Sequence, residues 1–144
     1  MKLLFLIVLV LAGLTPSCRT PSPAILAPGM IEPCGQKPNC VSAADSRPQF
    51  AVPLLDLKRL TPPEACGRFG GLLQKQQRVQ IVRLDKHYIH AEFRSATFGF
   101  VDDVEVLCTE RGILLRSQSR TGGFDWGVNR RRIESLRMSW QNES

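Results

Sequence analysis

The stretch RVQIVRLDKHYIHAEF, residues 78–93, decides the fold. Two runs of residues with alternating character flank Asp85 and Lys86, which are typical of a tight turn. The second run divides into two sets, Tyr88, His90 and Glu92 against Ile89, Ala91 and Phe93. Because successive side chains of a strand point to opposite faces of a sheet, this pattern predicts a β-hairpin with one apolar face.

Further strands are predicted on the C-terminal side of the hairpin. Residues 98–108 read as a third strand, and residues 113–117, after the turn at Arg111 and Gly112, read as a fourth. The short connections favour antiparallel neighbours, because a parallel pair needs a long crossover. We therefore expect a four-stranded antiparallel meander.

A predicted helix lies on each side of this meander in the chain. Thr61 and Glu64 form a capping-box pattern, with Pro62 and Pro63 in the first turn, and open a helix to about Gln76. A C-terminal helix over residues 126–140, capped by Asp125, carries an apolar stripe. The predicted fold class is α+β, a four-stranded antiparallel meander packed against an N-terminal and a C-terminal helix.

The N-terminus reads as a bacterial export signal over residues 1–17. Lys2 precedes a 12-residue apolar run, residues 3–14, whereas a membrane-spanning helix needs roughly 20 residues. The segment LTPSC, residues 14–18, resembles the lipobox of bacterial lipoproteins, so Cys18 is the expected lipidation site. Ordinary cleavage and an uncleaved anchor are the alternatives.

A proline-rich tether, residues 18–33, is expected to join the lipidated cysteine to the domain. Four prolines within residues 19–33 exclude a regular helix or a central strand. Extended as polyproline II, these 15 residues would reach up to about 45 Å from the membrane. The folded part is then a single α+β domain over residues 34–140.

The cysteines are consistent with an oxidising compartment. With Cys18 acylated, an even number remains, namely Cys34, Cys40, Cys66 and Cys108. Prolines bend the short stretch between Cys34 and Cys40, which favours that pair as a disulfide; a Cys66–Cys108 bridge would be the second. A redox-active Cys34–Cys40 pair is the alternative, although its spacing is not that of thiol oxidoreductases.

Neither a metal site nor a cofactor is expected. The only histidines, His87 and His90, are three apart in a predicted strand and so point to opposite faces.

Positive charge is concentrated near the C-terminus. Residues 111–137 hold seven arginines against Asp125 and Glu134, a net charge of +5, out of +6 for the whole chain. The candidate polar residues in and beside this segment are Asp102, Asp103, Arg116, Ser117, Ser119, Arg120, Asp125, Asn129, Arg130 and Arg132. They either bind an anion such as phosphate, sulfate or carboxylate, or pair with one another and lock the C-terminal helix to the sheet.

Four stretches carry a resemblance to a known family. They are CGQKPNCVS (34–42), GFVDDVE (99–105), RSQSRTG (116–122) and DWGVNRRRI (125–133). The chain resembles the bacterial domain-of-unknown-function family 1499 from Cys34 to about Leu136. It departs from the family pattern at Gly35, where the family usually has Pro, and at Ala43, where the family has a second Ser. The resemblance implies no particular reaction or ligand.

Three classes of function remain open. The first is a binding or interaction module that faces the periplasm, is held on the membrane by its lipid anchor, and meets an anionic lipid, a lipopolysaccharide phosphate or an envelope polymer. The second is a structural or assembly lipoprotein without a small ligand. The third is a hydrolase using Ser117 or Ser119 as the nucleophile, His87 or His90 as the base and an aspartate to orient it, although no nucleophile-elbow motif is present. Nucleic acid is not an expected partner despite the pI near 9.4, and the oligomeric state stays open.

Overall fold

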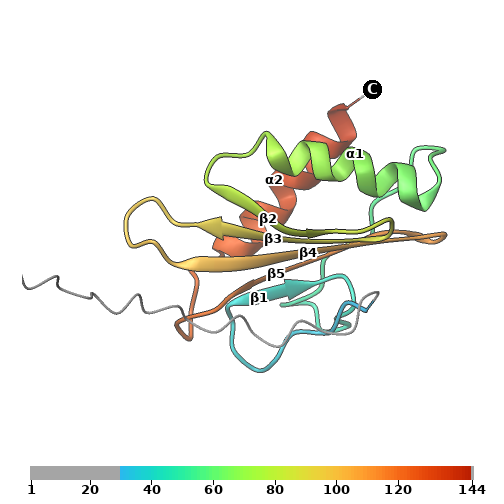
Figure 1. Cartoon of the computed structure of the whole chain (residues 1–144). Helices are drawn as coiled ribbons and strands as arrows, with labels where there is room; N and C mark the ends of the chain where they lie inside the picture. The colour runs from blue at the N-terminus through green and yellow to red at the C-terminus, as the bar shows by residue number, and fades with distance from the viewer. Residues whose placement is uncertain (1–29, 144) are drawn as a thin grey trace, which may run out of the picture.

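The computed structural model describes residues 30–143, which form one sheet and two helices (Figure 1). The elements in chain order are β1 (Cys40–Ser42), α1 (Pro62–Gln74), β2 (Val79–Leu84), β3 (Tyr88–Arg94), β4 (Val101–Thr109), β5 (Gly112–Ser119) and α2 (Val128–Asn142). The sheet is antiparallel throughout, with strand order β1-β5-β4-β3-β2. The predicted export signal, Cys18 and most of the tether lie outside the described residues.

The α+β class and the antiparallel sheet with two helices are confirmed, but the sheet has five strands instead of the four predicted. The additional strand is β1, which pairs with β5 so that Val41 lies opposite Ser117. Three residues are too few to show an alternating pattern. In addition, α2 begins at Val128 and not at Trp126, because Trp126 and Gly127 adopt left-handed backbone angles, φ 53° and 74°.

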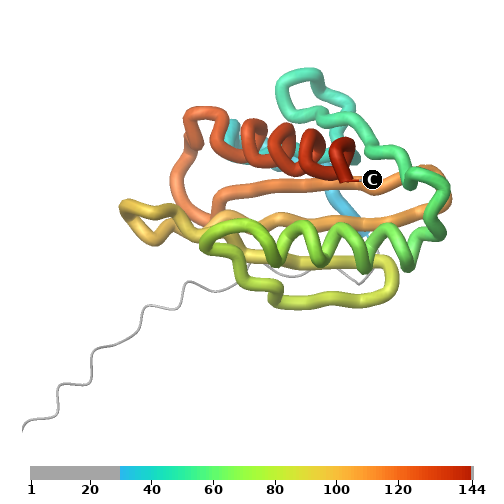
Figure 2. The backbone as a smooth tube through the Cα atoms, turned by 90° about the horizontal axis from the view of Figure 1, so that it is seen from above, coloured from blue at the N-terminus to red at the C-terminus, as the bar shows by residue number. Residues whose placement is uncertain are grey.

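Both helices cover the same face of the sheet (Figure 2). The Thr61–Glu64 capping box is formed, and Pro62 occupies the first turn of α1. The core between the layers is apolar, with the ring of Phe69 from α1 5.5 Å from that of Trp140 from α2. Within the described residues, neither helix has the length and apolar character needed to cross a membrane.

The opposite face of the sheet, called the outer face below, carries mainly polar side chains. Its members are Tyr88, His90 and Glu92 from β3, Asp103 and Glu105 from β4, and Arg116 and Gln118 from β5. Residue Ile31 of the N-terminal segment packs on one end of this face, against Tyr88 and Leu107. The alternation that buries one side of each strand in the core thus gathers charge on the other side.

One of the two predicted disulfides is present. Cys34 and Cys40 are bonded, with their Cα atoms 5.7 Å apart. The predicted Cys66–Cys108 bridge is not formed, since both residues are buried free thiols. Their side chains hydrogen-bond to each other, and that bond together with burial raises the pKa of the Cys108 thiol.

Candidate functional site

The candidate residues separate into two networks, one on each face of the sheet. On the helix side, Asn129 of α2 is fully buried and joins β5, the residue that precedes β1 and the loop before α2. Its Nδ2 donates to the Asn39 carbonyl at 3.0 Å, Ser119 Oγ at 2.9 Å and Asp125 Oδ2 at 2.8 Å. Its Oδ1 accepts from Ser117 Oγ at 2.5 Å. One buried amide therefore holds four segments together.

Arg132 extends the network on the helix side. Its Nη1 donates to Ser117 Oγ at 2.9 Å and to Asn129 Oδ1 at 2.8 Å, and its Nη2 donates to Asp102 Oδ2. The guanidinium also lies 4.9 Å above the ring of Phe93. The Asp102–Arg132 ion pair thus fastens α2 to β4.

Asp125 occupies the start of α2, where the loop after β5 was expected to offer backbone N–H groups to an anion. Its Oδ1 accepts from Gly127 N and its Oδ2 from Asn129 N, both at 2.9 Å. Burial alone would raise the pKa of Asp125, but these hydrogen bonds hold it below its usual value. The protein's own carboxylate therefore fills the predicted anion position.

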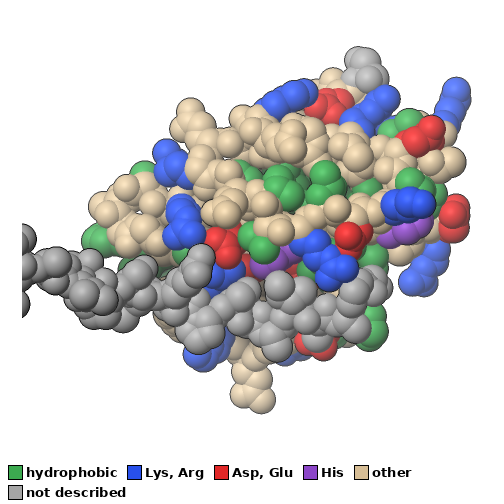
Figure 3. All heavy atoms as spheres, viewed as in Figure 1, with side chains coloured by type: hydrophobic (Ala, Val, Ile, Leu, Met, Phe, Trp, Pro, Cys, Tyr) green, Lys and Arg blue, Asp and Glu red, His purple; other side chains and the backbone are tan. Residues whose placement is uncertain are grey.

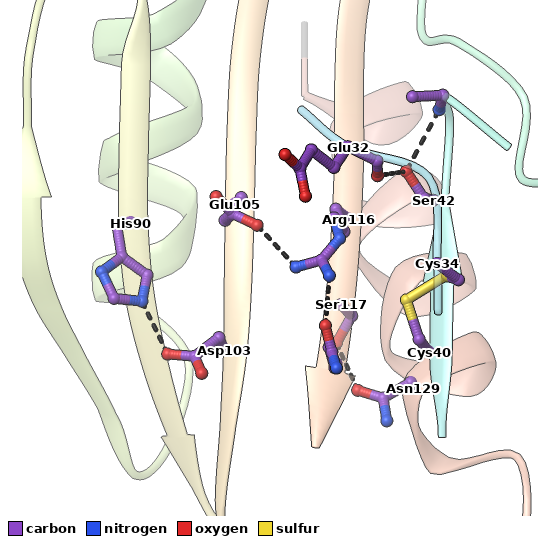
Figure 4. A network of polar contacts seen from close by, with 12 residues as sticks. Glu32, Cys34, Cys40, Ser42, His90, Asp103, Glu105, Arg116, Ser117 and Asn129 are labelled. Carbon is purple, nitrogen blue, oxygen red and sulfur yellow. Dashed lines mark hydrogen bonds and ion pairs between the residues drawn. A yellow bond between two sulfur atoms is a disulfide. The ribbon is translucent and has the colours of Figure 1, made fainter. Parts of the chain in front are cut away.

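The outer-face network is centred on Asp103, whose contact with His90 is drawn in Figure 4. Arg120 donates to both oxygens of Asp103, at 2.9 and 2.7 Å, and to Glu92 Oε1 at 2.5 Å. His90 Nε2 lies 2.7 Å from Asp103 Oδ1. Burial raises the pKa of the Asp103 carboxyl, yet His90 and Arg120 together hold it below its usual value. Asp103 is therefore ionised at neutral pH.

A second ion pair lies beside it on the outer face. Arg116 Nη1 donates to Glu105 Oε2 at 2.8 Å, and the Tyr88 hydroxyl donates to Glu105 Oε1 at 2.7 Å. Burial, reinforced by Glu105, raises the pKa of Tyr88. Sequence reasoning missed Tyr88, Glu92 and Glu105 as site residues and considered His90 only as the base of a hydrolase. The signal was present in the alternation of residues 88–93, which assigns Tyr88, His90 and Glu92 to one face.

The proposed nucleophiles and bases are not brought together. Ser117 is fully buried on the helix side of the sheet and donates to Asn129. His90 lies on the outer face, and His87 lies in the exposed turn between β2 and β3. No Ser–His–Asp arrangement is formed among the described residues, and no group of three or more His, Cys, Asp or Glu side chains there could hold a metal ion.

The seven arginines of the basic segment fall into two groups. Four form ion pairs with carboxylates, namely Arg116, Arg120, Arg132 and Arg137. Arg130 instead donates to the backbone carbonyls of Ala51 and Gln49, and Arg131 to that of Trp126. Within residues 30–143, Arg130, Arg131 and Arg111 have no carboxylate within ion-pair distance, so the uncompensated positive charge sits on them.

Four large aromatic side chains are exposed at one end of the domain, and we call them the aromatic end. They are Phe98 (75% exposed), Phe100 (53%), Phe124 (59%) and Trp126 (80%). The first two stack at 5.5 Å in the β3–β4 loop, and the last two meet edge to face at 5.1 Å in the β5–α2 loop.

The two aromatic loops lie at the same end of the sheet in both views (Figures 1 and 2). A hydrogen bond of 3.1 Å from Arg120 N to the Val101 carbonyl ties their bases together. Hydrophobic and basic side chains occur close together on the surface at this end (Figure 3). Arg131, which is exposed, contacts the backbone of Trp126. Uncompensated positive charge therefore lies next to exposed aromatic rings.

Comparison with known proteins identifies one family. The family model described as "Protein of unknown function (DUF1499)" matches residues 30–139, more than half of the chain. Neither a curated protein nor a solved structure matches the chain.

Proposed function

Since the chain belongs to the DUF1499 family of proteins of unknown function, which carries no stated activity, we propose a function from the geometry. The protein is an exported, lipid-anchored envelope protein, attached through Cys18, whose domain docks on an anionic membrane surface through the aromatic end. The observation that carries this proposal is the clustering of Phe98, Phe100, Phe124 and Trp126, all more than half exposed, beside Arg131.

Exposed rings of this size are costly in water and favourable at a bilayer interface. Burying one large apolar side chain contributes about 1.5–3 kcal/mol, and aromatic residues are enriched at the headgroup level of membranes. Soluble surfaces rarely leave such clusters uncovered unless they meet a partner. Four rings on two adjacent loops therefore support insertion into the interface over a purely structural role.

The charge next to the rings favours an anionic surface. Arg130 and Arg131 lie in the first turn of α2, and neither has a carboxylate partner within residues 30–143. Each basic residue near an anionic leaflet contributes about 1 kcal/mol. The predicted tether would let the domain turn this end toward the membrane that holds its anchor.

A second candidate is supported by the interlocked networks. Because Arg116, Arg120 and Arg132 are all paired with buried carboxylates, the basic segment largely stabilises the fold. This favours a structural or assembly lipoprotein without a small ligand, the role that would remain if docking failed.

The two tryptophans provide the test, because Trp126 is 80% exposed and Trp140 only 1%. The full-length protein is reconstituted through its anchor into vesicles containing phosphatidylglycerol and brominated phosphatidylcholine. We expect bromine to quench Trp126 fluorescence strongly, and less at raised salt or without phosphatidylglycerol, because screening weakens the contribution of the arginines.

Two variants serve as matched controls. Trp140→Phe isolates the Trp126 signal and should keep the quenching, whereas Trp126→Phe leaves only the buried Trp140 and should lose it. Equal Trp126 emission in brominated and unbrominated vesicles would exclude docking by the aromatic end and leave the assembly role.

A further inference from the structure

A cavity of about 200 Å³ lies beside the aromatic end. Its floor is formed by Cys40, Val41 and Phe50, which are only 4–6% exposed, and its rim includes Phe124, one of the four rings of the aromatic end. A disulfide to Cys34 holds Cys40 in place (Figure 4). The cavity is therefore an apolar hollow that is continuous with the proposed membrane-docking surface.

The size and the lining of the cavity restrict what can fill it. Pockets that bury a whole small molecule usually enclose about 300–1,000 Å³, so this one admits only a slender group. Water is a poor occupant, because an apolar floor offers it few hydrogen-bond partners. A hydrocarbon chain loses no hydrogen bonds on entering, and it removes the floor from contact with water.

Two charged side chains line the same cavity, and only one of them is open to a ligand. Arg130 donates to the carbonyls of Ala51 and Gln49, which uses two of the five N–H donors of its guanidinium, and no described carboxylate is paired with it. Asp125 is ionised, but both of its oxygens already accept from backbone N–H groups of α2 and the residue before it. The guanidinium is well suited to a phosphate oxygen.

The position of the cavity favours a membrane lipid over other apolar ligands, a step that rests on the proposed function. Apolar side chains that dock on a bilayer enter about 5–10 Å into the boundary between headgroups and acyl chains. Phe124 belongs both to the rim of the cavity and to the aromatic end. Docking at that depth therefore brings the mouth of the cavity to the acyl chains, with Arg130 beside it for the phosphate.

From this arrangement we propose that the cavity binds one acyl chain of an anionic phospholipid of the membrane, with Arg130 binding the phosphate of the same lipid. The end of the bound chain then lies against Val41 and Phe50. Lipids that merely surround the docked rings keep their chain ends in the middle of the bilayer. The position of the chain end thus distinguishes a lipid held in the cavity from lipids that only contact the surface.

Photo-crosslinking measures that position. The full-length, lipid-anchored protein is reconstituted into vesicles containing phosphatidylglycerol with a diazirine either close to the headgroup or at the end of one acyl chain. Mass spectrometry of peptides locates the labelled residues after illumination. We expect the first lipid to label Phe124 and Trp126, and the chain-end lipid to label Val41 and Phe50.

The outcomes separate failure of this proposal from failure of docking. Labelling of the rings without labelling of the floor would overturn the cavity proposal and leave docking intact, whereas labelling of neither would overturn both. The acyl chain on Cys18 is tested as an occupant in the same experiment. That chain carries no diazirine, so its presence in the cavity would keep the floor unlabelled.

Variants test the role of Arg130. Arg130→Gln should lower labelling of the floor, measured relative to labelling of Trp126, by about fivefold, and Arg130→Lys, which keeps the charge, should restore most of it. Arg111→Gln is the matched control and should be labelled as the wild type is, because Arg111 lies in the β4–β5 turn at the other end of the sheet. Equal labelling of the floor in Arg130→Gln and the wild type would overturn the phosphate contact.

Discussion

Asp103→Leu is expected to lower the free energy of unfolding by about 3–5 kcal/mol, the usual cost of removing one partner of a buried ion pair. The substitution leaves Arg120, whose side chain is 8% exposed, without both of its bonds to Asp103, and leaves His90 Nε2 without an acceptor. Denaturant unfolding of the purified protein measures the change.

The matched control for Asp103→Leu is an ion pair at the surface. Glu134 and Arg137 are both about one-third exposed, and Glu134→Gln should change stability by less than about 1 kcal/mol. Similar losses for the two variants would contradict a structural role for the outer-face network.

The same carboxylate predicts a pH dependence. The pKa of Asp103 is lower in the folded state than in the unfolded state. The ionised carboxylate therefore contributes to the free energy of unfolding at neutral pH, and this contribution is lost as the pH falls through the pKa of the folded state. Wild-type stability should therefore fall below about pH 4, and the fall should be shallower in Asp103→Leu. The pKa of Asp125 is also lowered, so Asp125 should make the stability of both proteins depend on pH in the same direction.

Asn129→Leu is the second substitution expected to have a large effect, again about 3–5 kcal/mol. It removes the amide that pairs with Ser117, Ser119, Asp125 and the Asn39 carbonyl, and each buried group left unpaired costs about 1–3 kcal/mol. The shape of the side chain is nearly preserved, so the loss reports on the hydrogen bonds.

Asn142→Leu, at the exposed C-terminal end of the same helix, provides the comparison for Asn129. A surface substitution of this kind usually changes the free energy of unfolding by less than about 0.5 kcal/mol. A small effect at both positions would mean that α2 is held by its apolar stripe alone and not by the Asn129 network.

Much of the fold could be predicted because its signals are local. The alternation of residues 78–93 predicts β2 and β3, and the Thr61–Glu64 capping box predicts the start of α1. The strand β1 could not be predicted in this way. Its three residues pair with β5, about 75 residues further along the chain, and no local pattern reports such a contact.

The candidate site could be predicted as a set of residues but not as an arrangement. Alternation along β5 already separates Arg116 from Ser117, yet both were assigned to one polar segment. Which carboxylate pairs with Arg120 depends on the register of β3 and β4, which places Glu92 opposite Asp103. Register is set by tertiary packing and turn geometry, and cannot be derived from composition.

The aromatic end was not predicted for a different reason. Phe98 and Phe100 were assigned to the third strand because residues 98–108 read as one continuous strand. In the structure β4 begins at Val101, and Gly99 adopts a left-handed φ of 65°, so the chain turns before the strand and both rings lie in a loop.

The arginines of the basic segment divide into those paired with carboxylates and those without a carboxylate partner in the described part of the chain, and thermal unfolding of Arg120→Lys beside Arg131→Lys tests this division most directly. Lysine cannot reproduce the two-pronged bond to Asp103, so Arg120→Lys should lower Tm by roughly 10 °C. Arg131→Lys should leave Tm unchanged, because Arg131 is exposed and bonds only a backbone carbonyl. Equal Tm values for the two variants would contradict the division.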